Sequence, residues 1–234
     1  MWAFFVGINY IWLMNVNQVY QLIQYIINKQ QTGDLSPDEF NLIMPQAERS
    51  YLAFLLGNPE QYQYGRQVAR IELGMNQPIM QRLTPFIQAP VTLSVSSGVA
   101  AYPADFEAAV AMYTSDDKRV RFVQQDSLYS YKNSVIDPVA TNPIYLIQSN
   151  GFLFYPNSIS SPKLSYVRTP NYMQWGYTLD GDGRPVYNSG TSVQPEWYDV
   201  DIMQIIARAL PMISVNLQAN DIAAYAAQLK AQGQ

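Results

Sequence analysis

Two charged segments carry residue types that could bind an ion. Asp180 to Gly183 reads Asp-Gly-Asp-Gly, in which two carboxylates could reach one calcium ion. An EF-hand loop also needs oxygen ligands further on and a Glu at its twelfth position, whereas Arg-Pro-Val-Tyr follows here. We therefore interpret this segment as a hairpin turn and predict neither a metal site nor a cofactor.

A basic segment follows Asp116 and Asp117 and could bind phosphate through Lys118, Arg119 and Arg121. In a strand, residues 119 and 121 share one face while residue 118 lies on the other. A solvated strand edge is therefore the favoured interpretation.

An aromatic group in the second half of the chain could stack on sugar rings or bases. Its members are Trp175, Tyr177, Tyr172, Phe152, Phe154 and Tyr155. The competing interpretation is sheet core and subunit interface, which we favour, and we assign Trp175 and Tyr177 to an interface.

The side chains of most catalytic sites are missing. The chain has no Cys and no His, which excludes Cys nucleophiles, His bases and the metal ligands of both types. Paired carboxylates would have to come from scattered acids whose spacing selects no pair: Glu107, Asp126, Asp137, Glu196 and Asp199. We expect a protein that is not an enzyme.

Helical periodicity dominates the first quarter of the chain. Apolar residues at helical spacing predict a helix from Asn15, its cap, to about residue 31. A second helix begins with the capping box Ser36 to Glu39, is expected to kink at Pro45, and ends at Gly57. Its predicted inward residues are Phe40, Met44, Ala47, Tyr51 and Leu55.

Strand patterns occupy the middle. Residues 58–90 are expected to be mostly irregular, and alternation from Val91 through Leu93 and Val95 predicts a strand. Residues 102–113 are interpreted as a short helix. Short strands then follow to residue 170, among them a hairpin over 143–156, and a second hairpin is predicted around the 180–183 turn.

The C-terminal region returns to helix. A first helix is predicted to end at Pro211, and a final helix is predicted to start near Asp221. The buried stripe of the first helix consists of Val200, Ile202, Ile205, Ile206, Ala209 and Leu210. The predicted fold class is α+β, a helical bundle of the N-terminal and C-terminal helices beside a small antiparallel β domain. The predicted parts are an apolar arm (1–13), helices with a connection (14–90), a β-rich part (91–195) and C-terminal helices (196–234).

The first 13 residues are almost entirely apolar. They are too short for a bilayer-spanning helix and lack the basic start of a signal peptide, so no membrane role is expected. The segment is either the product of a start assigned before Met14 or an arm that packs on another subunit or on its own bundle. Its expected interface residues are Trp2, Phe4, Phe5, Tyr10 and Trp12.

The surface composition favours a subunit of an assembly. Charged residues make up 14% of the chain, against about 25% in an average soluble domain. Gln, Asn, Ser and 18 Tyr supply polarity instead, and uncharged polar and aromatic surface suits protein interfaces. The net charge of −4 gives no basic field that would recruit nucleic acid.

Four segments form a recognisable pattern: the helical pair over 14–57, "YPADF" at 102–106, the strand block over 142–170 and the closing 196–233. Together they resemble neck ring, or head-to-tail adaptor, proteins of tailed bacteriophages, closest to those of crAss-like phages that infect Bacteroidetes. Residues 1–13 have no counterpart in this resemblance.

The resemblance implies a structural virion protein, made in the host cytoplasm and located in the neck or tail of the virion. It implies a homo-oligomeric ring, a dodecamer, docked under the portal protein among other neck and tail proteins. DNA would pass through the ring without sequence readout. Two alternatives are a carbohydrate-binding or other accessory virion protein that uses the aromatic group around Trp175, and a virion hydrolase.

Overall fold

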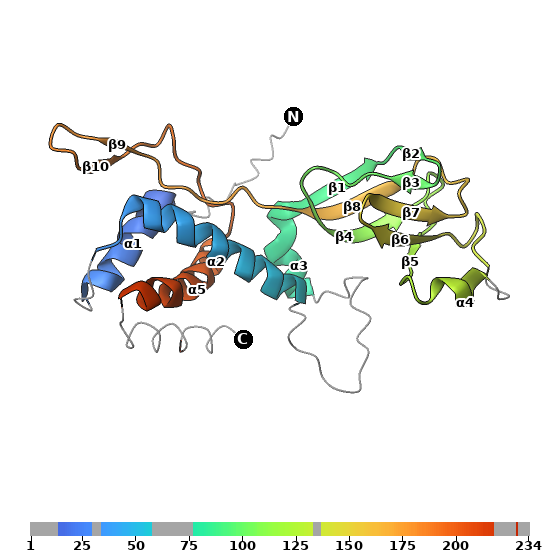
Figure 1. The fold of residues 1–234 in the computed structure, drawn as a ribbon, viewed down its shortest axis with the longest axis horizontal. Helices are drawn as coiled ribbons and strands as arrows, with labels where there is room; N and C mark the ends of the chain where they lie inside the picture. The colour runs from blue at the N-terminus through green and yellow to red at the C-terminus, as the bar shows by residue number, and fades with distance from the viewer. Residues whose placement is uncertain (1–13, 30–33, 58–76, 133–136, 218–227, 229–234) are drawn as a thin grey trace, which may run out of the picture. The chain divides into compact units, whose positions relative to one another are not determined.

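The computed structural model describes residues 14–29, 34–57, 77–132, 137–217 and 228. The chain forms two compact units, one from Met1–Phe54 with Asn171–Gln234 and the other from Leu55–Pro170 (Figure 1). We call them the helical unit and the β unit. The β-rich part expected over 91–195 is therefore divided, because its last segment, 171–195, belongs to the helical unit.

The first helix of the helical unit, α1 (Val16–Lys29), begins as predicted. Asn15 Oδ1 accepts the Gln18 N–H at 2.8 Å, and Gln18 Oε1 accepts the Asn15 N–H at 2.9 Å. This reciprocal pair satisfies two donors that a helix start otherwise leaves unpaired. The buried side chains follow helical spacing at Val16, Val19, Ile23 and Ile27.

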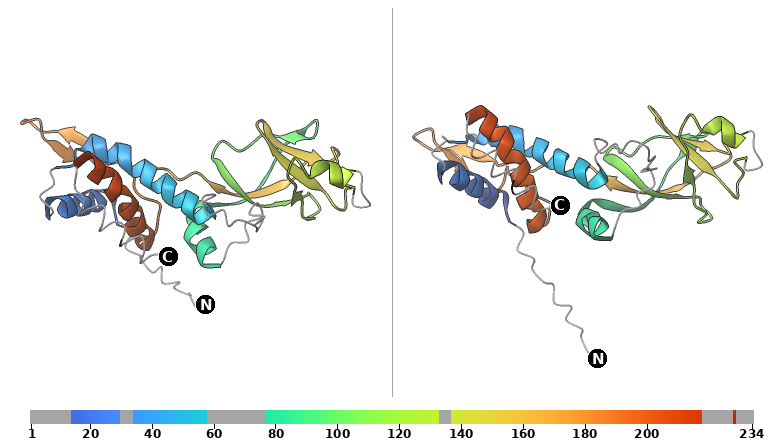
Figure 2. Two further views of the ribbon diagram at one scale, coloured as in Figure 1. Left: turned by 60° about the horizontal axis from the view of Figure 1, so that its bottom comes forward. Right: turned by 90° about the horizontal axis from the view of Figure 1, so that it is seen from below.

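The second helix, α2 (Pro37–Gly57), confirms the capping box and all five predicted inward residues. The Ser36 N–H donates to Glu39 Oε2 at 3.0 Å, and the Glu39 N–H donates to Ser36 Oγ at 3.3 Å. The helix passes through Pro45 and ends at Gly57, whose φ of 93° stops it. Figure 2 shows α1 and α2 beside α5 (Asp199–Leu217) in two further views.

The expected end of α5 at Pro211 is wrong. An internal proline costs a helix about 3 kcal/mol. Burial of Leu210 and Ile213 on either side contributes about 1.5–3 kcal/mol each, enough to carry the helix through. Val200 was also predicted to be buried but is 68% exposed. The helix expected from Asp221 lies outside the described residues, apart from residue 228.

Beyond the end of α2, the described residues of the β unit form two short α-helices, a 3-10 turn and two sheets. The segment expected to be irregular includes α3 (Gln77–Leu83), a 3-10 turn (Thr84–Phe86) and the start of β1, and its residues 58–76 lie outside the described residues. The first sheet has the order β1 (Ile87–Thr92), β8 (Lys163–Arg168), β4 (Phe106–Tyr113), and all its pairs are antiparallel.

The second sheet has five strands, in the order β2 (Val95–Ser96), β3 (Val99–Ala100), β7 (Gly151–Tyr155), β6 (Ile144–Gln148), β5 (Arg121–Phe122). The pair β5 and β6 is parallel, so the expectation of a purely antiparallel domain is corrected. The predicted β6–β7 hairpin is confirmed, with Gln148 opposite Gly151. A Cβ on Gly151 would lie 2.0 Å from the Ala100 carbonyl oxygen, so only Gly fits there.

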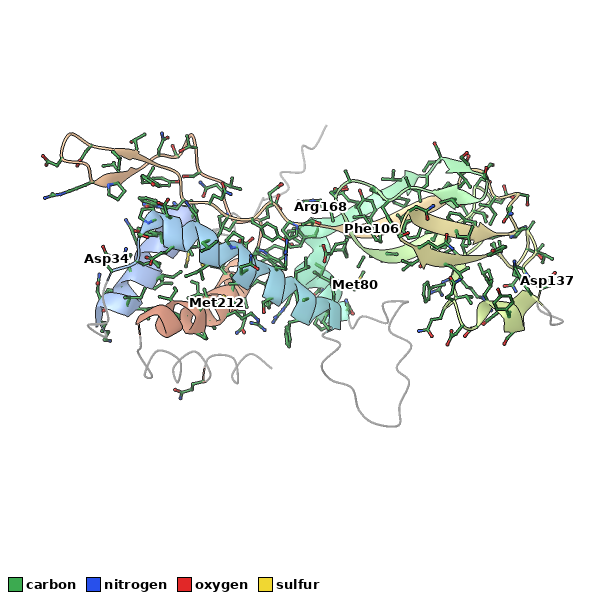
Figure 3. All side chains as sticks on the ribbon, viewed as in Figure 1. Asp34, Met80, Phe106, Asp137, Arg168 and Met212 are labelled. Carbon is green, nitrogen blue, oxygen red and sulfur yellow. The ribbon has the colours of Figure 1, made fainter. Side chains whose placement is uncertain are left out.

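The prediction of a helix over 102–113 is wrong, because residues 106–113 of this segment form the strand β4. Its register with β8 runs from Phe106 opposite Arg168 to Tyr113 opposite Lys163, and both labelled residues of the first pair lie at the same end of the sheet (Figure 3). The alanines suggested a helix, but pairing along a whole strand overrides that weak preference.

The two sheets share one core. Its buried side chains come from both, with Leu164 and Tyr166 on β8 and Phe152 and Phe154 on β7. A second, smaller cluster includes Leu128 of α4 (Leu128–Lys132) and Ile144 and Leu146 of β6. The alternation predicted from Val91 holds only in part, because Leu93 is 7% exposed and Val91 is 43% exposed.

Candidate functional site

A β-hairpin, β9 (Tyr177–Leu179) and β10 (Pro185–Tyr187), projects from the helical unit (Figures 1 and 2). Its turn is the predicted one at residues 180–183. Asp180 Oδ1 accepts the N–H groups of Asp182 at 2.9 Å and of Arg184 at 2.8 Å. The carboxylate of Asp180 therefore holds the turn together. Within the described part of the chain, no group of three or more acidic side chains is arranged to hold a metal ion.

A buried tryptophan anchors the base of this hairpin. Trp175 is 4% exposed and stacks on Tyr20 at a centroid distance of 4.5 Å and on Tyr177 at 5.8 Å. Its indole N–H donates to Asn17 Oδ1 at 3.0 Å. Because its polar atom is satisfied and its rings are covered, Trp175 joins the hairpin to α1.

The backbone around Trp175 is clamped from two sides. Asn41 of α2 accepts the Trp175 N–H at 2.7 Å and donates to the Trp175 carbonyl at 3.1 Å. A Cβ on the next residue, Gly176, would lie 2.3 Å from Thr191 Oγ1. The returning chain at Thr191 can therefore pass this closely only because residue 176 is Gly. The direction in which the hairpin leaves the unit is thereby fixed.

Two tyrosine hydroxyls also attach the base of the hairpin to the rest of the helical unit. Tyr177 donates to Asp38 Oδ1 at 3.0 Å, and this hydrogen bond raises the pKa of Tyr177. Tyr187 accepts from Gln194 Nε2 at 3.2 Å, and Gln194 Oε1 accepts the Val16 N–H at 3.0 Å. The base of the hairpin and the start of α1 are therefore linked through one side chain.

The outer half of the hairpin exposes apolar side chains on both faces. Leu179 is 64% exposed and pairs with Pro185, whereas Val186 is 49% exposed and pairs with Thr178 on the opposite face. Neither strand pairs with any other described strand. Exposed strand edges with apolar side chains are typical of surfaces that bind another chain.

The aromatic group predicted from the sequence is divided between the units. Trp175 and Tyr177 are together, and Tyr172 lies apart, where Arg49 is 5.7 Å from its ring centroid. Phe152, Phe154 and Tyr155 belong to the β unit. A sugar could stack on the buried Trp175 only if the hairpin opened. The arm residues Trp2, Phe4, Phe5, Tyr10 and Trp12 lie outside the described residues.

Sequence reasoning missed a buried polar group in the helical unit. Glu48 of α2 is fully buried, and its Oε1 accepts the Met173 N–H at 3.2 Å, while its Oε2 has no hydrogen-bond partner among the described residues. Burial raises the pKa of Glu48 to about 8; the Met173 hydrogen bond opposes this rise and Glu196 adds to it. The signal was present, because Glu48 lies four residues after Met44 on the apolar stripe of α2.

A second buried polar contact joins α2 to α5. Tyr51 donates to Asp201 Oδ1 at 2.5 Å. The Arg208 guanidinium lies 4.9 Å from the Tyr51 ring centroid and 4.8 Å from that of Phe54, and burial lowers its pKa. These groups pair with each other across the unit, which is the usual condition for burying a charge.

The remaining predicted polar residues are dispersed. Glu196 accepts the Asn171 N–H at 3.0 Å and Asp199 accepts the Met14 N–H at 2.6 Å, so both fix backbone within the helical unit. Glu107, Asp126 and Asp137 belong to the β unit. Lys118, Arg119 and Arg121 are exposed at and before β5, as predicted for a solvated strand edge.

Comparisons of this chain with protein-family models and with curated proteins each returned no match. Among the described helices, none combines the length and the apolar character needed to cross a membrane.

Proposed function

We propose that this chain is a structural subunit of a tailed-bacteriophage virion, a ring-forming head-to-tail adaptor beneath the portal. The resemblance of the segments 14–57, 102–106, 142–170 and 196–233 to neck ring proteins suggests this role. In it the chain has no enzymatic activity, and its work is to bury surface between neighbouring subunits.

The observation that carries the proposal is the β9–β10 hairpin. Leu179 and Val186 are exposed at its outer half, while Trp175 and Asn41 hold its base against the helices. A rigidly held apolar projection loses little conformational entropy on binding, which favours contact with a neighbouring subunit. The low content of charged residues, 14%, is consistent with extensive contact between subunits.

The same proposal assigns a role to the helices. Through α1 and α2 the helical unit holds the base of the hairpin, which contacts the neighbouring subunit in this proposal. DNA passes through the ring without base contacts, which fits a chain whose net charge is −4.

The decisive experiment is cryo-electron microscopy of the phage particle combined with mass spectrometry of its proteins. We expect density for this chain as a ring at the neck, with the hairpin in contact with the adjacent copy. Absence of the chain from the particle, or its presence there as isolated monomers, would overturn the proposal.

A pair of variants tests the hairpin itself. Leu179→Asp places a charge on the exposed face of β9, and Leu42→Asp is the matched control, because Leu42 is also in the helical unit and is 71% exposed. We expect Leu179→Asp to fold normally by circular dichroism but to fail to join the neck, whereas Leu42→Asp joins it. Incorporation of Leu179→Asp at the wild-type level would contradict a contact role for the hairpin.

A further inference from the structure

The start of α5 presents apolar side chains to solvent. Val200 is 68% exposed and Met203 is 37% exposed, and their spacing of three residues places them next to each other on one face. Ile202 and Ile205, which lie on the other side of the same helical turn, are buried. The described chain therefore leaves a short apolar face uncovered at the start of α5.

The N-terminal part of the chain is attached at this same place. The Met14 N–H donates to Oδ1 of Asp199, the residue directly before Val200, at 2.6 Å. Two residues further on, the Val16 N–H donates to Gln194 Oε1 at 3.0 Å. The chain that precedes Met14 therefore starts next to the uncovered face.

The segment that precedes Met14 has the matching chemistry. Residues 1–13 contain no charged side chain and include two Trp and two Phe. An extended chain advances about 3.3 Å per residue, and one helical turn rises about 5.4 Å, so a few residues suffice to cover Val200 and Met203. Burying apolar surface of both partners is the driving force.

Other occupants are placed less favourably. The C-terminal residues leave α5 after Leu217, which is roughly 26 Å from Val200 along a helix that rises about 1.5 Å per residue. A second copy would have to associate first, whereas a segment tethered beside the face has an effective concentration on the order of millimolar.

We propose that Val200 and Met203 form the docking surface for residues 1–13 of the same chain. This docking does not depend on the function proposed above, because it concerns one molecule alone. The sequence pattern predicts that Val200 is buried, yet the described residues leave it 68% exposed. Docking of residues 1–13 would account for this difference.

The absence of Cys from the chain makes the test direct. Val200→Cys is prepared in the full chain and in a chain that lacks residues 1–13, and alkylation by a small maleimide is followed by intact mass. We expect alkylation to be about tenfold faster in the shortened chain, because its thiol is uncovered. Leu42→Cys is the matched control, 71% exposed on α2, and its rate should be equal in both chains. Equal rates for Val200→Cys in both chains would overturn the proposal.

A second experiment needs no deletion. In the double variant Ile11→Cys with Val200→Cys, mild oxidation should give a disulfide within one chain, seen as a monomer on a non-reducing gel and located by peptide mass. A double variant of Ile11→Cys with Leu42→Cys should form this disulfide at least tenfold more slowly. Disulfide-linked dimers as the main product would overturn docking within one chain and assign the face to a second copy.

Discussion

Replacing Glu48 by Gln should make the helical unit more stable at neutral and alkaline pH. Glu48 of α2 is fully buried against the segment at Met173, and burial raises its pKa from 4.5 to about 8. Gln keeps the shape of the side chain and the oxygen that accepts the Met173 N–H, but it cannot ionise. The variant therefore isolates the cost of the buried charge.

The direction in which the unfolding free energy changes with pH depends on whether the folded or the unfolded chain binds the proton. Below pH 4.5 Glu48 is protonated in both the folded and the unfolded chain, so its full contribution to stability is present. Between pH 4.5 and 8 only the folded chain holds the proton, and the free energy of unfolding falls as pH rises. Above pH 8 the carboxylate is ionised in the folded chain as well, and the contribution has been lost.

The two pKa values, 4.5 and about 8, set the size of the effect. Each pKa unit corresponds to about 1.4 kcal/mol, so the whole contribution is ~5 kcal/mol, of which about 3 kcal/mol is already lost at pH 7. This is a large fraction of the 5–15 kcal/mol by which domains are usually stable. Glu48→Gln should equal the wild type near pH 4 and exceed it in unfolding free energy by ~3–5 kcal/mol at pH 8 to 9.

Urea unfolding followed by tryptophan fluorescence measures this unit selectively, because all four Trp residues lie in Met1–Phe54 and Asn171–Gln234. Asp137→Asn is the matched control: it also replaces a carboxylate by an amide, but at an exposed position of the β unit (Figure 3). Its unfolding curves should follow the wild type at every pH. Parallel pH dependence of Glu48→Gln and wild type between pH 5 and 9 would refute the reasoning.

Variants at three further positions test individual contacts. Tyr51→Phe removes the donor to Asp201 in a buried contact and should lower the unfolding free energy by about 1–3 kcal/mol in the same fluorescence assay; no loss would show that this hydrogen bond is not stabilising. Ser36→Ala removes the cap of α2 and should cost about 1 kcal/mol, whereas Ser36→Gly should cost only a few tenths. Gly151→Ala forces a Cβ to 2.0 Å from a carbonyl oxygen in the β unit, so the chain should lose folded β signal by circular dichroism, and a wild-type spectrum and melting curve would contradict the close approach.

Features that rest on neighbouring residues could be predicted from the sequence. The caps at Asn15 and Ser36 and the hairpin turns after Gln148 and after Leu179 depend on side chains within a few positions of one another. The inward side of α2 follows equally from spacing, because a helix places residues three and four apart on one face. For these elements local chemistry is sufficient.

Features that depend on distant partners could not be predicted in this way. Residues 106–113 became a strand because β8, at least 50 residues away, pairs with them from Phe106 to Tyr113, with two register shifts. The helix α5 passes through Pro211 because apolar residues on both sides of it are buried. Both outcomes are decided by burial and pairing energies that exceed the local preferences.

The candidate site shows the same division. Residue types and spacing alone identified the hairpin turn that begins at Asp180 and grouped Trp175 with Tyr177. Only the tertiary structure decided that Trp175 is an internal anchor and that Leu179 is exposed at the outer half of the hairpin, because exposure depends on what packs against each face. A sequence pattern specifies which side chains share a face, and the packing of the chain against that face decides whether it is covered.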